Sequence, residues 1–158
     1  MAAPSVTARS APVGIKLDDG YSTKIAFAAD PDVSFWEKTV KPPGIDGGDA
    51  IDQTTMHNTA YRTSAARALK TLTDSSSTVA YDPAVYTQIL ALINVEGSIT
   101  IHFPDGSTLA FYGFLKSFEV NDHTEGEQPE ATISIVPTNF DPTNKVEAAP
   151  VLTSVAGT

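Results

Sequence analysis

The sequence predicts a mainly β domain of the α+β class with one α-helix. Short segments in which apolar and polar residues alternate indicate strands, clusters of Pro, Gly and Asp separate them, and one longer segment has helical periodicity. The length of 158 residues suits one domain, and a hydrophobic content of 41% lies in the globular range. Because the chain contains no cysteine, packing alone must hold this domain together.

The chain divides into an arm, a domain and a tail. Residues 1–13 are rich in Ala, Ser and Pro and predict a flexible N-terminal arm, since such a composition cannot offset its ordering entropy by burial. Residues 14–141 form the predicted domain, and the Pro- and Ala-rich residues 142–158 form a C-terminal tail. No apolar run approaches the length of a membrane span, so we expect no membrane partner.

The first strand is predicted at residues 24–28, where Ile25 and Phe27 share one face. Residues 35–61 follow with weak periodicity and several Pro and Gly residues, which predicts a long loop. Structureless loops of this length are usually functional in compact domains, so we expect contacts between subunits here. Residues 74–77, the run Asp-Ser-Ser-Ser, predict a turn.

One helix is predicted at residues 83–93. Asp82 is its expected N-cap, Pro83 suits the first helical position, and Asn94 lies near its end. At about 100° per residue, one broad apolar face forms, and we expect it to cover a sheet. The residues of this face are Val85, Tyr86, Ile89, Leu90, Leu92 and Ile93.

A β-hairpin and a further strand follow the helix. The alternation of Ile99, Ile101 and Phe103 predicts the first strand of the hairpin, a turn lies at 104–107, and the second strand covers 108–118. Gly113 inside the second strand predicts a bulge or a close backbone approach. Residues 131–136 predict the last strand.

The charges are unevenly distributed along the chain. From residue 81 onward there are ten carboxylates against Lys116 and Lys145 alone, and this half supplies almost all of the net charge of −9. Such a surface repels a phosphate backbone, so the sequence excludes a protein that grips nucleic acid. The densest acidic cluster consists of Glu119, Asp122, Glu125, Glu127 and Glu130.

No motif predicts catalysis, a cofactor or a metal. His57, His102 and His123 lack ligand spacing, and neither a nucleophile elbow nor a phosphate-binding loop is present. The loop acids Asp46, Asp49 and Asp52 suggest calcium, but their spacing does not fit an EF-hand. We therefore predict a non-enzyme with no cofactor, no metal ligands and no catalytic residues.

The aromatic residues leave an alternative function open. Six of them could form a sugar platform on a carbohydrate-binding β-sandwich, although packing in a core or interface is the simpler interpretation. They are Phe35, Trp36, Phe111, Tyr112, Phe114 and Phe118. A capsid decoration protein is a further alternative.

Three segments together carry a family resemblance: residues 72–83 (LTDSSSTVAYDP), 103–118 (FPDGSTLAFYGFLKSF) and 126–139 (GEQPEATISIVPTN). In this order they resemble the major tail tube protein of long, non-contractile-tailed (siphovirus-type) bacteriophages, over residues 14–141. The resemblance implies a β-sandwich or barrel flanked by one helix, with a long loop and extended terminal arms. It also implies hexameric rings that stack into a tube through which the genome leaves the capsid.

The resemblance also implies partners and site residues. The partners are further copies of the chain and the tape-measure, tail terminator and distal tail proteins, while DNA passes through an acidic lumen without specific binding. The protein would lie in the virion tail after assembly in the host cytoplasm. The acidic cluster would face the lumen or would meet bases such as Lys38, Lys41, Arg62 or Arg67 at a ring interface. The candidate stacking-loop residues are Trp36, Lys38, Lys41, Asp46, Asp49 and Asp52.

Overall fold

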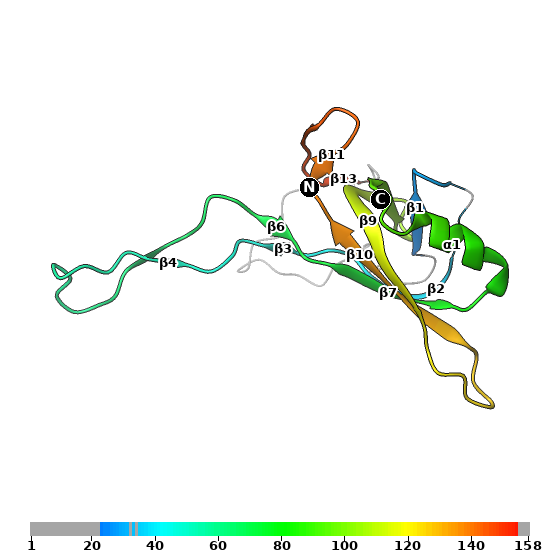
Figure 1. The fold of residues 1–158 in the computed structure, drawn as a ribbon. Coiled ribbons are helices and arrows are strands. Elements are labelled where there is room, and N and C mark those ends of the chain that lie inside the picture. The colour runs from blue at the N-terminus through cyan, green and yellow to red at the C-terminus, as the bar shows by residue number, and fades with distance from the viewer. Residues whose placement is uncertain (1–22, 32, 34, 155–158) are drawn as a thin grey trace, which may run out of the picture.

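The computed structural model describes residues 23–31, 33 and 35–154 (Figure 1). The predicted N-terminal arm at residues 1–13 lies outside this part of the chain. One antiparallel sheet dominates the structure, in the order β1-β8-β9-β10-β7-β2, and β13 also pairs with β9. Its strands are β1 (Lys24–Phe27), β2 (Trp36–Lys41), β7 (Ser75–Ala80), β8 (Gly97–His102), β9 (Thr108–Val120), β10 (Glu130–Pro137) and β13 (Val151–Thr153).

The long strand β9 organises this sheet. Its first half pairs with β8 and β13, and its second half pairs with β10. Ser134 of β10 pairs with Ser117 of β9, but the next residue, Ile135, pairs with Leu115. Lys116 is therefore the extra residue of a bulge, which bends β9. The predicted mainly β, sandwich-like fold with one helix is confirmed. The barrel alternative is not, because no ladder joins the end strands β1 and β2 in the described chain.

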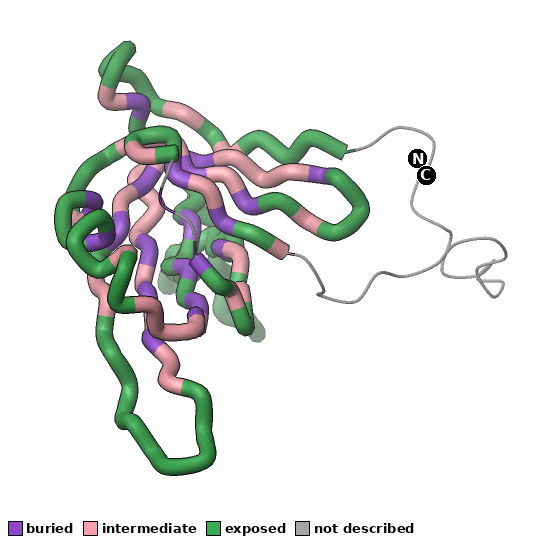
Figure 2. The backbone as a smooth tube through the Cα atoms, turned by 90° about the vertical axis from the view of Figure 1, so that its right-hand side faces the viewer, coloured by how far each residue is buried: buried purple, intermediate pink, exposed green. Residues whose placement is uncertain are grey.

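The two halves of the sheet enclose one hydrophobic core. Core-facing residues alternate along β1, β7, β8, β9 and β10, as period-two patterning requires. Five hydrophobic core residues are 0% exposed: Ile101, Leu115, Ala131, Ile133 and Ile135. Gly113 lies at a close backbone approach, as predicted, since a Cβ atom there would be 2.6 Å from the carbonyl oxygen of Val136. This packing accounts for the buried strands in Figure 2.

The helix consists of a 3-10 turn, η1 (Pro83–Val85), followed by α1 (Tyr86–Leu92). Asp82 is the N-cap, and its carboxylate accepts a hydrogen bond from the amide of Ala84 at 2.9 Å. Ile89 and Leu92 are buried, and Val85 and Ile93 are half-buried against the core. The predicted apolar face is too broad, because Tyr86 and Leu90 are 41% and 51% exposed. Tyr86 and Leu90 lie four residues apart on one edge of the helix, beyond the stripe of Val85, Ile89, Leu92 and Ile93 that contacts the core.

The structure differs from the sequence analysis at residues 74–77 and 35–61. Strand β7 replaces the predicted turn, with Ser75 and Ser77 buried and Ser76 exposed. The hydroxyl of Ser75 donates to the carbonyl of Lys41 at 2.5 Å, which satisfies one of these polar groups. Strand β2 occupies the beginning of the predicted loop and pairs with β7.

The predicted C-terminal tail is also structured as far as residue 154. Strands β11 (Phe140–Asp141) and β12 (Val146–Glu147) form a small hairpin, and β13 joins the main sheet beside β9. The carboxylate of Asp141 is buried and accepts hydrogen bonds from Thr143 and Asn144 in the turn. These hydrogen bonds hold the turn in a defined shape, although the sequence of this segment has no apolar periodicity.

Residues 42–73 form a long protrusion (Figure 1). We call this protrusion the arm from here on; it is distinct from the predicted N-terminal arm at residues 1–13. Near the body, β3 (Ile45–Asp46) pairs with β6 (Thr71–Leu72), and farther out β4 (Ile51–Asp52) pairs with β5 (Ser64–Ala65). Both limbs of the arm leave the sheet next to one another, since β2 and β7 are paired. In the described residues no helix could cross a membrane.

Candidate functional site: the arm and the acidic hairpin

The arm exposes apolar side chains that the body does not cover. None of residues 44–71 is buried. An isolated two-stranded hairpin is marginally stable in water, and large exposed apolar side chains gain stabilisation when a neighbouring surface covers them. The arm therefore has the properties of one half of an interface. Its large exposed apolar residues are Ile45 (69%), Ile51 (47%), Met56 (99%), Tyr61 (84%) and Leu69 (81%).

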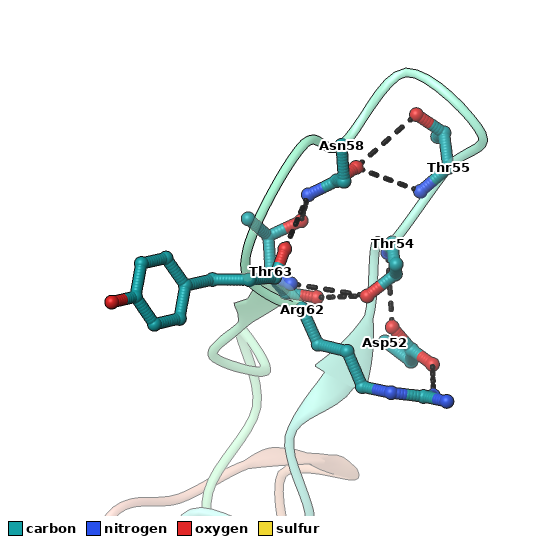
Figure 3. Close-up of polar contacts among 7 residues, drawn as sticks. Asp52, Thr54, Thr55, Asn58, Arg62 and Thr63 are labelled. Atoms are coloured by element: carbon teal, nitrogen blue, oxygen red, sulfur yellow. Dashed lines mark hydrogen bonds and ion pairs between the residues drawn. The ribbon is translucent and has the colours of Figure 1, made fainter.

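Hydrogen bonds give the tip of the arm a defined shape without a core. The side chain of Asn58 accepts from the amide of Thr55 and donates to the carbonyl of Tyr61, each at 2.9 Å. The hydroxyl of Thr54 accepts from the amide of Thr63 at 3.0 Å across the two limbs (Figure 3). These bonds order the tip in the isolated chain, which lowers the entropy cost of docking it on a partner.

Two acidic residues of the arm accept hydrogen bonds from backbone amides in its turns. Asp46 accepts from the amide of Gly48 at 2.8 Å, and Asp52 accepts from the amide of Thr54 at 2.9 Å. Hydrogen bonds from the hydroxyl and the amide of Thr54 lower the pKa of Asp52. The guanidinium of Arg67 donates to the carbonyl of Asp49 at 2.7 Å and joins the two limbs. Across the described part of the chain no three metal-ligating side chains converge, so the calcium interpretation has no support there.

The acidic cluster lies on one hairpin, residues 119–130, which we call the acidic hairpin. Glu119 is the second-last residue of β9, Glu130 begins β10, and Asp122, Glu125 and Glu127 are exposed in the connection between them. A shallow hollow of about 900 Å³ lies along it, lined by residues of both limbs and by Lys38. The structure thus brings the five predicted acids to one projecting element.

One of these acids is neutralised within the chain. Lys38 of β2 forms an ion pair with Glu130, across the intervening strand β7. The register of β2 shifts between Glu37 and Thr39, so Lys38 is the extra residue of a bulge, a feature that can redirect a side chain. Lys38 therefore tethers the base of the acidic hairpin, and four acids stay exposed.

The predicted stacking-loop residues fall into two groups. Asp46, Asp49 and Asp52 lie on the arm, whereas Trp36, Lys38 and Lys41 lie on β2 in the body. The predicted loop began at residue 35, but the arm begins at residue 42, so these three residues lie in the sheet. The returning limb and the exposed apolar residues Met56, Tyr61 and Leu69 were not among the predicted site residues. Their signal was a few isolated large apolar residues in a polar, Thr-rich stretch.

The six aromatic residues do not form a sugar platform. Phe35 and Phe111 are buried, and Tyr112, Phe114 and Phe118 are half-buried. Trp36, at 68% exposure, is the one large exposed ring of this set. The ring of His123 lies edge-on to Tyr81, and His57 and His102 are exposed on other elements, so the histidines do not converge either.

Comparisons with known proteins give matches of structure only. No protein-family model matches the chain, and no curated protein matches it. A chain from the virion of a native gene transfer agent particle superposes with a TM-score of 0.60 and 10% identity over 87% of this chain and 100% of that one. A chain from the tail of an empty gene transfer agent particle with C6 symmetry has a TM-score of 0.55 and 11% identity, over 89% and 100%. A chain from the six-fold symmetrised anti-feeding prophage baseplate has a TM-score of 0.55 and 8% identity, over 85% and 92%. At these identities the likeness shows that the chain shares their fold.

Proposed function

We infer that the chain is a structural protein of a phage-type virion tail, which polymerises as stacked six-membered rings into a tail tube. The fold shared with chains of a gene transfer agent virion, a gene transfer agent tail and a prophage baseplate supports the tail assignment. The uncovered apolar arm carries the proposal, since it needs a neighbouring surface that its own body does not supply. Self-association is then the activity, and no catalysis is involved.

The arm supplies the contact between rings in this proposal. A projecting element that docks on a different surface of the next copy makes a heterologous contact, and such contacts generate rings or filaments. The hydrogen-bonded tip presents Met56 and Tyr61 without further ordering. Tape-measure, terminator and distal tail proteins would contact the inside and the ends of the tube.

The acidic hairpin suits a wall past which DNA slides. Several Lys or Arg contacts per ring would bind phosphates strongly, whereas an acidic wall avoids adhesion. The screening length is about 8 Å at physiological salt, so the repulsion acts only close to the wall. In the alternative placement, Asp122, Glu125 and Glu127 meet Arg62 or Arg67 of another copy at a ring interface.

Electron microscopy of the purified chain tests the proposed function. Wild type should form rings or tubes. Met56→Asp and Leu69→Asp should keep the circular dichroism spectrum and melting temperature of the subunit but abolish stacking, because each introduces a charge into the apolar contact. Thr87→Asp, at an exposed position of α1, is the matched control and should assemble normally. A wild-type chain that stays monomeric under all salt conditions would disprove the proposal.

Salt and charge reversal separate the two placements of the acidic hairpin. Reversal of Asp122, Glu125 and Glu127 to Lys leaves the Lys38–Glu130 pair intact. If the acidic hairpin lies in the lumen, the charge-reversed variant should form normal tubes that release DNA slowly. Wild-type tubes should then be insensitive to salt. An interfacial position predicts that high salt loosens wild-type tubes and that the reversed variant fails to assemble. Normal assembly together with normal DNA release would eliminate both.

A further inference from the structure

A groove separates the two end strands of the main sheet. It has a volume of about 1140 Å³ and runs between β1 and β2, which are contacting but not paired. Its apolar lining comes from the two strands and the segment between them: Ile25, Val33, Phe35, Trp36 and Val40. A mostly apolar groove beside a strand edge fits an extended segment of another chain.

The edge of β1 that faces this groove presents backbone groups. The amide of Ala28 donates to the carbonyl of Ser98 on β8 at 3.0 Å. Amides alternate in direction along an antiparallel ladder, so those of Ile25 and Phe27 point away from β8, toward the groove. An edge of this kind is a template for strand pairing.

Glu37 occupies this edge in the isolated subunit. Its carboxylate accepts a hydrogen bond from the amide of Ile25 at 3.0 Å, in place of a carbonyl from a paired strand. A side chain that satisfies an edge amide is a known way to keep sheets from joining. A strand that enters the groove must displace this carboxylate.

We propose that the groove between β1 and β2 binds the edge strand β13 of a second copy, and that Glu37 holds the groove closed until this copy arrives. The proposal rests on the proposed function, since it names a contact through which subunits associate. Strand β13 is suitable because one edge pairs with β9 and its residues Val151 and Leu152 are 59% and 66% exposed. The two surfaces are also alike in polarity, since exposed Val151 and Leu152 would meet the apolar lining residues Ile25, Val33 and Val40.

The contact cannot form within one chain. Lys24 pairs with His102, His102 with Thr108, and Thr108 with Thr153, so β1 and β13 lie on opposite sides of β8 and β9. Three strand spacings amount to about 14 Å, whereas a disulfide needs Cα atoms within about 7 Å. A disulfide between these strands therefore reports contact between copies.

The absence of native cysteine makes this test direct. Lys24→Cys combined with Thr153→Cys or with Val151→Cys, two positions on the same side of β13, should give a ladder of disulfide-linked oligomers in assembled material. Each single variant should stop at dimers, and Lys24→Cys with Thr87→Cys should give no ladder. If wild type forms tubes and neither double variant forms a ladder, the groove is not the interface, while the proposed function stands. A monomeric wild type overturns both.

Substitution of Glu37 tests the closing role. Glu37→Ala should lower the protein concentration at which assembly begins by about tenfold, because the entering strand no longer displaces a charge-assisted bond. Glu37→Gln keeps an acceptor oxygen and should stay closer to wild type, and Glu147→Ala is the control for loss of an exposed acid. Thermal unfolding checks that each variant folds. An unchanged or higher threshold for Glu37→Ala overturns the closing role.

Discussion

The body and the arm of this chain are stabilised in different ways. The body buries Ile101, Leu115, Ile133 and Ile135 completely, and its strands satisfy one another's backbone groups. The arm buries nothing between residues 44 and 71 and depends on short hydrogen bonds between side chains and backbone. The body thus carries its own core, whereas in the proposed tube the apolar surface of the arm would be stabilised by a neighbouring copy.

The largest expected difference between the body and the arm is in the free energy of unfolding that is lost when one isoleucine in each is truncated to alanine. Ile133→Ala in the body should lower the free energy of unfolding by about 2–5 kcal/mol, because it leaves a cavity in a closed core. Ile51→Ala in the arm should change it by less than about 0.5 kcal/mol. Urea unfolding of the subunit measures both. Similar losses for the two variants would contradict an arm that is independent of the core.

Substitution of one glycine in the body and one in the arm compares how closely the backbone is packed in the two regions. Gly113→Ala should cost about 1–3 kcal/mol, because its Cβ atom would lie 2.6 Å from the carbonyl of Val136 and the strands would have to separate. Gly47→Ala on the arm meets no atom within 4 Å and should change stability by less than about 0.5 kcal/mol. Melting temperatures of the two variants are sufficient to rank them. A tolerated Gly113→Ala would mean that β9 and β10 can shift apart freely.

The body was more predictable from the sequence than the arm, for a physical reason. Ile25 and Phe27 in β1 and Ile133 and Ile135 in β10 alternate because one face of each strand is buried, and alternation is what sequence patterns reveal. Strand β7 was missed because serines occupy two of its three core-facing positions. The arm has no buried face at all, so no periodicity marks its strands.

The candidate site was predictable in composition but not in geometry. The acidic cluster could be named because its five members are close in sequence. The pairing of Glu130 with Lys38 spans 92 positions and depends on a bulge in β2, which no local pattern indicates. The same holds for the bond from the Ile25 amide to Glu37, since it requires both ends of the sheet to meet.

The two core serines of β7 provide a finer test of how the body tolerates polar groups. Ser75→Ala should cost about 1 kcal/mol because it removes the bond to the carbonyl of Lys41. Ser77 is 3% exposed, and its hydroxyl has no hydrogen-bond partner in the described structure. Ser77→Ala should therefore raise the free energy of unfolding by about 1 kcal/mol. A loss for Ser77→Ala as large as for Ser75→Ala would point to a bond that forms only in solution.

The smallest expected difference between the body and the arm is in how acid pH changes their stability. Hydrogen bonds from the hydroxyl and amide of Ser107, at 2.6 and 2.8 Å, lower the pKa of Asp105 in the body, and bonds from Thr54 lower the pKa of Asp52 in the arm. A lowered pKa in the folded state stabilises the fold fully above the ordinary value of 3.8 and loses this stabilisation as the pH falls through the folded value. Asp105→Asn should therefore flatten the decrease of unfolding free energy below about pH 4.

Asp52→Asn should leave that decrease unchanged and should instead speed amide exchange at the arm tip. In the described structure the partners of Asp52, Thr54 and Arg62, both lie within the arm. Urea unfolding between pH 7 and pH 2.5, with hydrogen exchange at neutral pH, measures both effects. If Asp52→Asn altered the global acid transition as much as Asp105→Asn, the arm and the body would unfold as one cooperative unit. The exposed apolar surface of the arm would then contribute to the stability of the isolated subunit, and its need for a neighbouring copy would lose its physical basis.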